Sequence, residues 1–259
     1  MKNKKILLGF LAIAVAFTTS CSNDDNQSSE NLKIVAKATY SGSSSRNANV
    51  VSISEFKINL SSIKFELDDD FYEDDDENYG DGFYGDDDEF QLSGPFELDL
   101  LNGPTTITTL NIPNGVYEEV EFEMEKSVNP SSNLFNKSIQ IKGSINGTPF
   151  VFWHNVNEDF EIDYDDAGQN LTIANNSATL VFNFNLDNVL ANVDLSVATD
   201  GNNDGIIEIS PTDNDGNNAL ANLIKDEIND STDLYDDNDD DGEDDDDEDD
   251  DDGKNNSVK

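Results

Sequence analysis

The sequence predicts an all-β protein, built as an antiparallel β-sandwich. From Asn31 onward, apolar residues recur mainly with a period of two, which is the period of a strand with one buried and one solvated face. About ten short segments of this kind are separated by Asn, Gly and Pro, the residues that favour turns. Helical periodicity is scarce.

The expected strands all lie between residues 32 and 186. In chain order they are 32–40, 50–67 (one long strand or two short ones), 95–101, 105–112, 116–127, 137–145, 148–156, 159–164, 170–174 and 178–186. The segment 116–127 alternates most clearly, because Val120, Phe122 and Met124 share one face and glutamates fill the other. Asn146-Gly147 predicts a type I′ hairpin turn.

One short C-terminal helix is expected at 217–228, where Leu220, Leu223, Ile224 and Ile228 share a face. Residues 187–193 are compatible with a single helical turn. We therefore expect the sandwich domain to span 32–228. Residues 229–259 offer nothing further to bury and are predicted to form a disordered acidic tail.

The charge of the chain is strongly uneven. The formal net charge is −43, with 13 acids in 68–89 and 16 in 233–252, and neither segment contains Lys or Arg. The first segment is predicted to be an acidic loop, either simply solvated or ordered by cations so that it presents its aromatic residues to a partner. This charge argues against nucleic acid as a partner and favours divalent cations.

The N-terminus predicts a membrane anchor. A basic start (residues 1–5) precedes an apolar run of 12 residues (6–17), too short to span a bilayer. Thr18, Thr19 and Ser20 follow, and then Cys21, the only cysteine. This pattern resembles a bacterial lipoprotein signal, although Thr18 stands where such signals usually have Leu.

That resemblance implies cleavage after residue 20 and acylation of Cys21, for example with palmitate. Residues 21–31 would then be a flexible tether. Asp24 and Asp25 resemble the surface-export signal of flavobacterial-type lipoproteins; the alternative is an ordinary polar tether. The expected location is the outer membrane, with the protein held by its lipid at the cell surface.

Three further segments resemble an uncharacterised family of bacterial lipoprotein domains. They contain Asp99-Leu100-Leu101 with Gly103; Pro113, Gly115 and Tyr117; and Phe182, Phe184 and Asp187. The resemblance implies a β-sandwich of immunoglobulin-like or prealbumin-like form and no particular activity.

Residues 200–216 form an Asp/Asn-rich segment that predicts a calcium loop. Oxygen-bearing side chains alternate at Asp200, Asn202 and Asp204, and Gly205 follows, as in the pattern D-x-[DN]-x-[DN]-G. The expected ligands are these three side chains, the carbonyl of Ile206, and Asp213 or Asp215, because Pro211 occupies the usual twelfth position. The alternative is a turn stabilised by Asx hydrogen bonds alone.

Catalysis has little support in the sequence. His154 is the only histidine, and no nucleophile-elbow pattern is present. Trp153 is either a core residue or a sugar-stacking platform. We therefore expect a non-catalytic, calcium-dependent binding or structural protein of the cell envelope, with a glycan or an envelope protein as partner. The alternatives are a carbohydrate-binding accessory of a glycan-uptake system and a hydrolase.

Overall fold

The computed structural model describes residues 30–42, 50–67, 89–163, 171–173 and 178–237. The strands are β1 (Leu32–Thr39), β2 (Val51–Leu67), β3 (Glu89–Asp99), β4 (Thr105–Leu110), β5 (Gly115–Met124), β6 (Ile139–Ile145), β7 (Thr148–His154), β8 (Glu158–Asp163), β9 (Leu171–Ile173), β10 (Ala178–Asn185), β11 (Ile207–Ile209) and β12 (Thr232–Asp236). The helices are α2 (Leu186–Asn192), the short 3₁₀ helix η2 (Leu195–Val197) and α3 (Asn218–Asp230).

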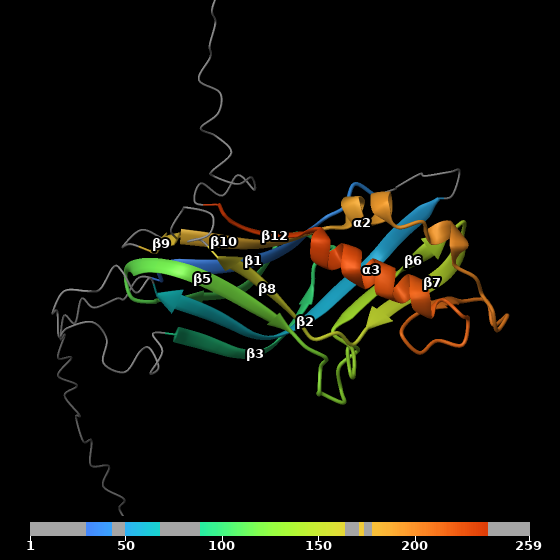
Figure 1. Ribbon diagram of the computed structural model, residues 1–259, viewed down its shortest axis with the longest axis horizontal. Coiled ribbons are helices and arrows are strands. Elements are labelled where there is room, and N and C mark those ends of the chain that lie inside the picture. Colours follow the sequence, from blue (N-terminus) through green and yellow to red (C-terminus); the bar gives the residue numbers. More distant parts are fainter. Residues whose placement is uncertain (1–29, 43–49, 68–88, 164–170, 174–177, 238–259) are drawn as a thin grey trace, which may run out of the picture.

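The described strands form two sheets (Figure 1). One has the order β12-β10-β1-β4, and the other has the order β11-β7-β6-β2-β5-β8, with β3 added to β2 and β9 added to β5. The predicted all-β class is therefore confirmed. The sheets are mixed, however, and not purely antiparallel, because β1 pairs with β10 in parallel and β11 pairs with β7 in parallel.

The long strand β2 connects the two halves of the larger sheet. Its first half, Val51–Ile58, pairs with β6, and its second half, Leu60–Leu67, pairs with β5. On its other side, Lys57–Glu66 pairs with β3. Periodicity left open whether this segment was one strand or two; the structure shows one strand of 17 residues.

The core lies on the inner face of the larger sheet and is covered by two different layers. Over the second half of β2, the ring centre of Phe182 on β10 lies 4.8 Å from that of Phe122 on β5, and the sheet of β10 reaches the first half at Phe56, whose ring centre lies 5.2 Å from that of Phe184. Over the first half, α2 and α3 cover β6 and β7 (Figure 1). None of the described helices has the length and apolarity needed to cross a membrane.

The hairpin and the strand of alternating glutamates form as predicted. Asn146 and Gly147 both have positive φ, 52° and 83°, as a type I′ turn requires. Val120, Phe122 and Met124 are fully buried. On the opposite face of β5, Glu121 forms an ion pair with Lys64 at 2.9 Å.

The C-terminal boundary is the main correction. The chain was expected to lose its structure after Asn229, but α3 continues to Asp230 and β12 then pairs with β10. The backbone of β10 offers this pairing, and Leu234 packs against the core. Residues 68–88 of the predicted acidic loop and 238–259 of the predicted tail lie outside the described residues, as does Cys21 with the signal and most of the tether.

Candidate functional site

The Asp/Asn-rich segment (residues 200–216) lies between η2 and α3 in the chain. Its middle is β11, whose Ile207 and Ile209 are buried and which extends the larger sheet beside β7. This pairing fixes a turn on either side of β11. The segment thus has a defined structure, although most of its side chains are polar.

The first turn is held by successive side-chain-to-backbone hydrogen bonds. The carboxylate of Asp200 accepts from the backbone N–H groups of Asp204 (3.1 Å) and Gly205 (2.9 Å). The Asn202 amide oxygen also accepts from Asp204 N–H, at 2.8 Å. Asp204 accepts from Ile206 N–H at 2.9 Å. The three predicted ligand side chains therefore lie on the inside of one turn.

The second turn is organised by Asp213, which precedes α3. One oxygen of its carboxylate accepts from the N–H groups of Asp215, Gly216 and Asn217 at 2.9–3.0 Å. The other accepts from Ser210 N–H at 2.8 Å. This carboxylate already has four backbone partners, so its role in the structure is to shape the turn that starts the helix.

Asp215 joins the two turns. It is only 6% exposed, and its carboxylate accepts from the N–H of Asn202 in the first turn (3.1 Å) and from the N–H of Glu208 in β11 (2.7 Å). The backbones also touch here, because a Cβ added at Gly201 would lie 2.4 Å from the Asp215 carbonyl oxygen. Asp215 is therefore the residue of this segment whose position depends on both turns.

Asn217 was not among the predicted residues, yet it closes the segment. Its side-chain NH₂ donates to the carbonyls of Thr199 (2.8 Å) and Glu208 (2.7 Å), and its oxygen accepts from Thr199 N–H (3.1 Å). Both N–H groups of its amide donate and its oxygen accepts one hydrogen bond, while the residue is 5% exposed. The sequence shows an Asn at the start of the predicted helix, which indicates a helix cap but does not predict these hydrogen bonds to Thr199 and Glu208.

The predicted metal ligands lie near one another but do not form a closed cage. Among the described residues, no group of three or more His, Cys, Asp or Glu side chains is arranged to hold a metal ion. The segment nevertheless carries five acids and no base. No ion pair joins any of these five to another described residue. Their mutual repulsion is therefore relieved mainly by backbone N–H groups.

Trp153 lies on the outer face of β7, opposite to the face of Phe150 and Phe152, which are buried in the core. It is half-buried there. The ammonium group of Lys137 lies 5.9 Å from the centre of its ring and donates to Gln140 Oε1 at 2.7 Å. Trp153 is therefore not a core residue, and a cation already occupies one side of its ring.

A network of charged side chains surrounds Gln140 on this outer face and was not predicted. Glu55 accepts from Gln140 at 2.7 Å and forms ion pairs with Lys142 (2.7 Å) and Lys57 (3.0 Å). Burial alone raises the pKa of Glu55, but the bonds from Lys142, Lys57 and Gln140 outweigh it and lower the pKa to about 2. The alternation of Lys and Glu in these strands was the sequence signal that could have predicted this network.

His154 has no catalytic partner among the described residues. Its Nε2 lies 3.4 Å from the amide oxygen of Asn222 on α3, and its Nδ1 is buried without a hydrogen bond. Burial lowers the pKa of His154. Among the described residues, the side-chain hydrogen-bond partner of the His154 ring is therefore an amide.

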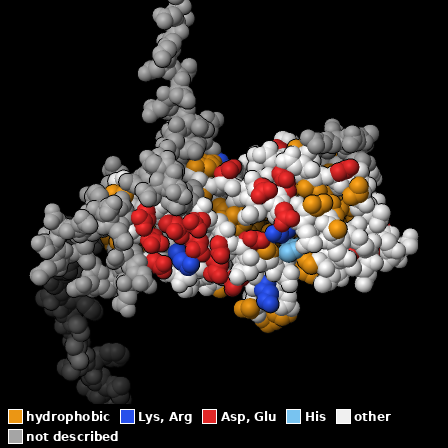
Figure 2. Space-filling model, in the orientation of Figure 1, with side chains coloured by type: hydrophobic (Ala, Val, Ile, Leu, Met, Phe, Trp, Pro, Cys, Tyr) orange, Lys and Arg blue, Asp and Glu red, His pale blue; other side chains and the backbone are white. Residues whose placement is uncertain are grey.

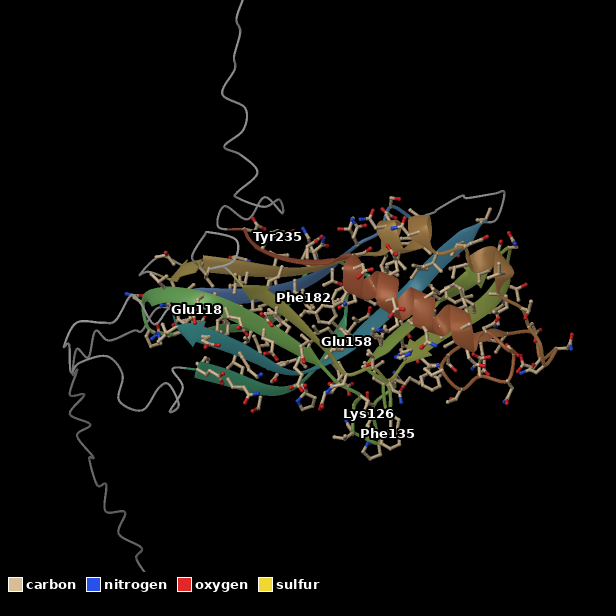
Figure 3. All side chains as sticks on the ribbon, viewed as in Figure 1. Glu118, Lys126, Phe135, Glu158, Phe182 and Tyr235 are labelled. Atoms are coloured by element: carbon tan, nitrogen blue, oxygen red, sulfur yellow. The ribbon has the colours of Figure 1, made fainter. Side chains whose placement is uncertain are left out.

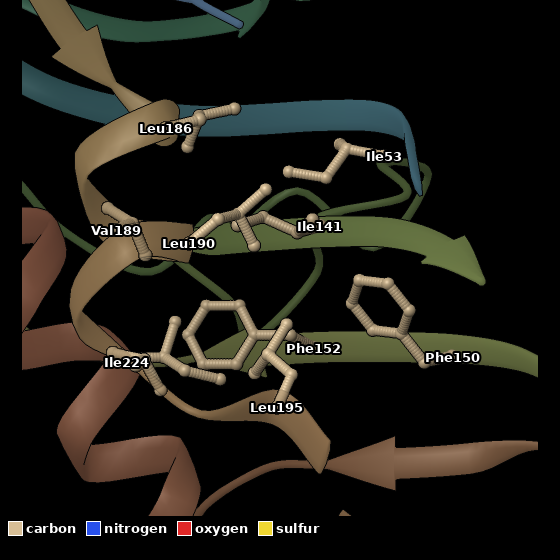
Figure 4. A pocket seen from close by; sticks show the side chains of 10 residues that line it. Ile53, Ile141, Phe150, Phe152, Leu186, Val189, Leu190, Leu195 and Ile224 are labelled. Carbon is tan, nitrogen blue, oxygen red and sulfur yellow. The ribbon is translucent and has the colours of Figure 1, made fainter. Parts of the chain in front are cut away.

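A small cavity lies between the larger sheet and the helices α2 and α3 that pack on it (Figure 4). Its lining is wholly apolar, and its residues are Ile53, Ile141, Phe150, Phe152, Leu186, Val189, Leu190, Val193, Leu195 and Ile224. Its volume is about 10 Å³, which is close to the minimum for one water molecule. It is a packing defect beneath the helices and too small for an organic ligand.

Comparisons with known proteins add no identification. No protein-family model matches the chain, and neither the curated proteins nor the solved structures include a match to it.

The Glu55 network gives a prediction for pH. Because the folded-state pKa of Glu55 lies below its ordinary value of 4.5, its contribution to stability is complete above pH 4.5 and is lost as the pH falls through 2. Glu55→Gln should lower the free energy of unfolding at pH 7, and its difference from the wild type should shrink as the pH approaches 2. Chemical denaturation at several pH values measures this. Asp230→Asn, at an exposed acid of α3, is the control; a difference that does not change with pH would contradict the prediction.

Proposed function

We propose that this chain is a lipid-tethered, non-catalytic protein of the bacterial cell envelope, with a binding or structural role. The observation that carries the proposal is the position of Cys21. The only thiol of the chain follows a basic start, an apolar run too short to span a bilayer and three small polar residues. Eleven residues further on, β1 begins the folded body.

The form of the fold is part of the proposal. We infer a β-sandwich in which the second layer is composite: the sheet β12-β10-β1-β4 covers one half of the larger sheet, and α2 with α3 covers the other. The contacts of Phe182 and Phe184 with the larger sheet support it. An immunoglobulin-like or prealbumin-like relationship is a finer proposal that rests on the sequence resemblance.

Calcium is the proposed ligand of the Asp/Asn-rich segment. Asp200, Asn202 and Asp204 face the inside of one turn, and buried Asp215 contacts the same turn. Hard oxygen donors of this kind suit Ca²⁺. In a segment with five acids and no base, a bound cation would also reduce the repulsion between carboxylates. Asp213 is a weaker candidate, because its carboxylate is saturated by N–H donors.

The lipid anchor is tested by metabolic labelling with palmitate. The wild-type chain should carry the label and sediment with membranes, whereas Cys21→Ser should lose the label. Ser22→Ala changes the adjacent residue and should keep it. A mature wild-type protein recovered free in the medium, with an unmodified thiol by mass spectrometry, would refute the anchor.

Calcium binding is tested by thermal melting with Ca²⁺ or with a chelator. With a dissociation constant of ~10⁻⁴–10⁻³ M, about 10 mM Ca²⁺ should raise the melting temperature by roughly 3 to 10 °C. Asp204→Ala should remove most of that increment, and Asp230→Ala should keep it. If Asp204→Ala retains the full rise, the cation acts elsewhere, for example on the acid-rich segments, and the site is wrong.

A further inference from the structure

The β5–β6 loop (residues 125–138) exposes apolar side chains at the end of a protrusion. Val128 is 78% exposed and Phe135 is 42% exposed. Pro130, between them in the sequence, is exposed as well. Figure 3 shows Phe135 and Lys126 together on this loop, which projects away from the body beside β6 and β7. The space-filling view shows hydrophobic and basic side chains gathered on the same protrusion (Figure 2).

This loop is held in a defined shape. The carboxylate of Glu97 on β3 accepts from the hydroxyls of Ser127 (2.7 Å) and Ser132 (2.6 Å), which lie on the two sides of the loop. Ser127 exchanges backbone hydrogen bonds with Lys137 (2.9 Å) and Asn136 (2.8 Å). Leu134 is 1% exposed. The body thus orders the loop through Leu134 and Glu97 while Val128 and Phe135 remain in water.

The charge of the loop is opposite to that of the chain. Residues 125–138 contain two lysines and one acid, Glu125, although the net charge of the chain is −43. Lys137 is used against Trp153, so Lys126 is the cation available at the exposed end. Lys126 makes no ion pair with a described residue. An apolar tip with a free cation beside it fits the boundary between lipid chains and anionic phosphate headgroups.

We propose that the β5–β6 loop inserts Val128 and Phe135 into the headgroup region of the membrane to which the chain is tethered, with Lys126 on lipid phosphate. The inference rests on the proposed lipid anchor. Eleven residues from Cys21 to Leu32 reach at most ~40 Å, so the tether keeps the loop near the bilayer and a weak insertion suffices.

A lipid surface explains these features better than a protein partner does. A stable protein interface buries about 800 Å² on each partner, and two or three apolar side chains at the end of a loop supply only a part of that. Interfacial insertion needs only a few apolar side chains and an adjacent base. Apolar residues are also exposed in other regions, such as Val197 and Leu223, and exposure alone is ordinary for a protein surface.

The test uses the lipidated full chain in vesicles of phosphatidylethanolamine and phosphatidylglycerol. Because Cys21 is the only cysteine and is acylated, Val128→Cys provides a single thiol for a polarity-sensitive fluorophore. A nitroxide on the lipid near the headgroup should quench that fluorophore. Leu223→Cys, 59% exposed on α3, is the matched control and should escape quenching.

Two additional variants examine the contact in the labelled Val128→Cys background. Phe135→Ser should reduce the ratio of inserted to free loop by about tenfold, because it removes the aromatic side chain that the proposal places in the headgroup region of the membrane. Lys126→Glu should have its largest effect in anionic vesicles at low salt. In both variants the chain should remain with the vesicles through its lipid.

The outcomes separate the two proposals. A chain that does not associate with vesicles and carries no acyl group contradicts the anchor itself. A chain that is anchored but shows no quenching at position 128, or equal quenching at positions 128 and 223, overturns the insertion. A fluorophore at position 128 that is shielded only when other envelope proteins are added also overturns it and assigns the loop to a protein partner.

Discussion

The strand β2 is the constraint on which the rest of the structure depends. Its 17 residues pair first with β6 and then with β5 on one side, and with β3 on the other. The buried side chains of β2 meet different layers along its length, since Ile53 lies under the helices and Phe56, three residues later, contacts Phe184 of the second sheet. A continuous β2 therefore makes one body from two different packing arrangements.

Both proposed interaction regions depend on this body. The Asp/Asn-rich segment is fixed at one end because β11 adds to β7 and because the turn at Asp213 leads into α3. The β5–β6 loop is fixed because both flanking strands pair with β2 and because Glu97 of β3 holds its two sides. A body that fixes both the proposed calcium segment and the proposed lipid contact fits the structural or binding role proposed for the chain.

Local features were predictable from the sequence, and long-range pairings were not. The turn at Asn146-Gly147 follows from the φ values these residues adopt, and the burial of β5 follows from alternation. The parallel pairing of β1 with β10 joins segments far apart in the chain, and no periodicity specifies it. β12 was missed because acids flank its few apolar residues. The sequence placed Asp213 and Asp215 near the candidate site, but the N–H groups that occupy Asp213 become visible only in three dimensions.

Native-state hydrogen exchange along β2 tests most directly the claim that one strand unites the body. If β2 unites the body, the amides of Phe56 and Ile58, in the first half, and of Ile63 and Phe65, in the second, exchange through the same global unfolding with the same free energy. If residues 51–58 open with β6, β7 and the helices at a clearly lower free energy while residues 60–67 stay protected, the two halves are independent units and β2 does not unite the body.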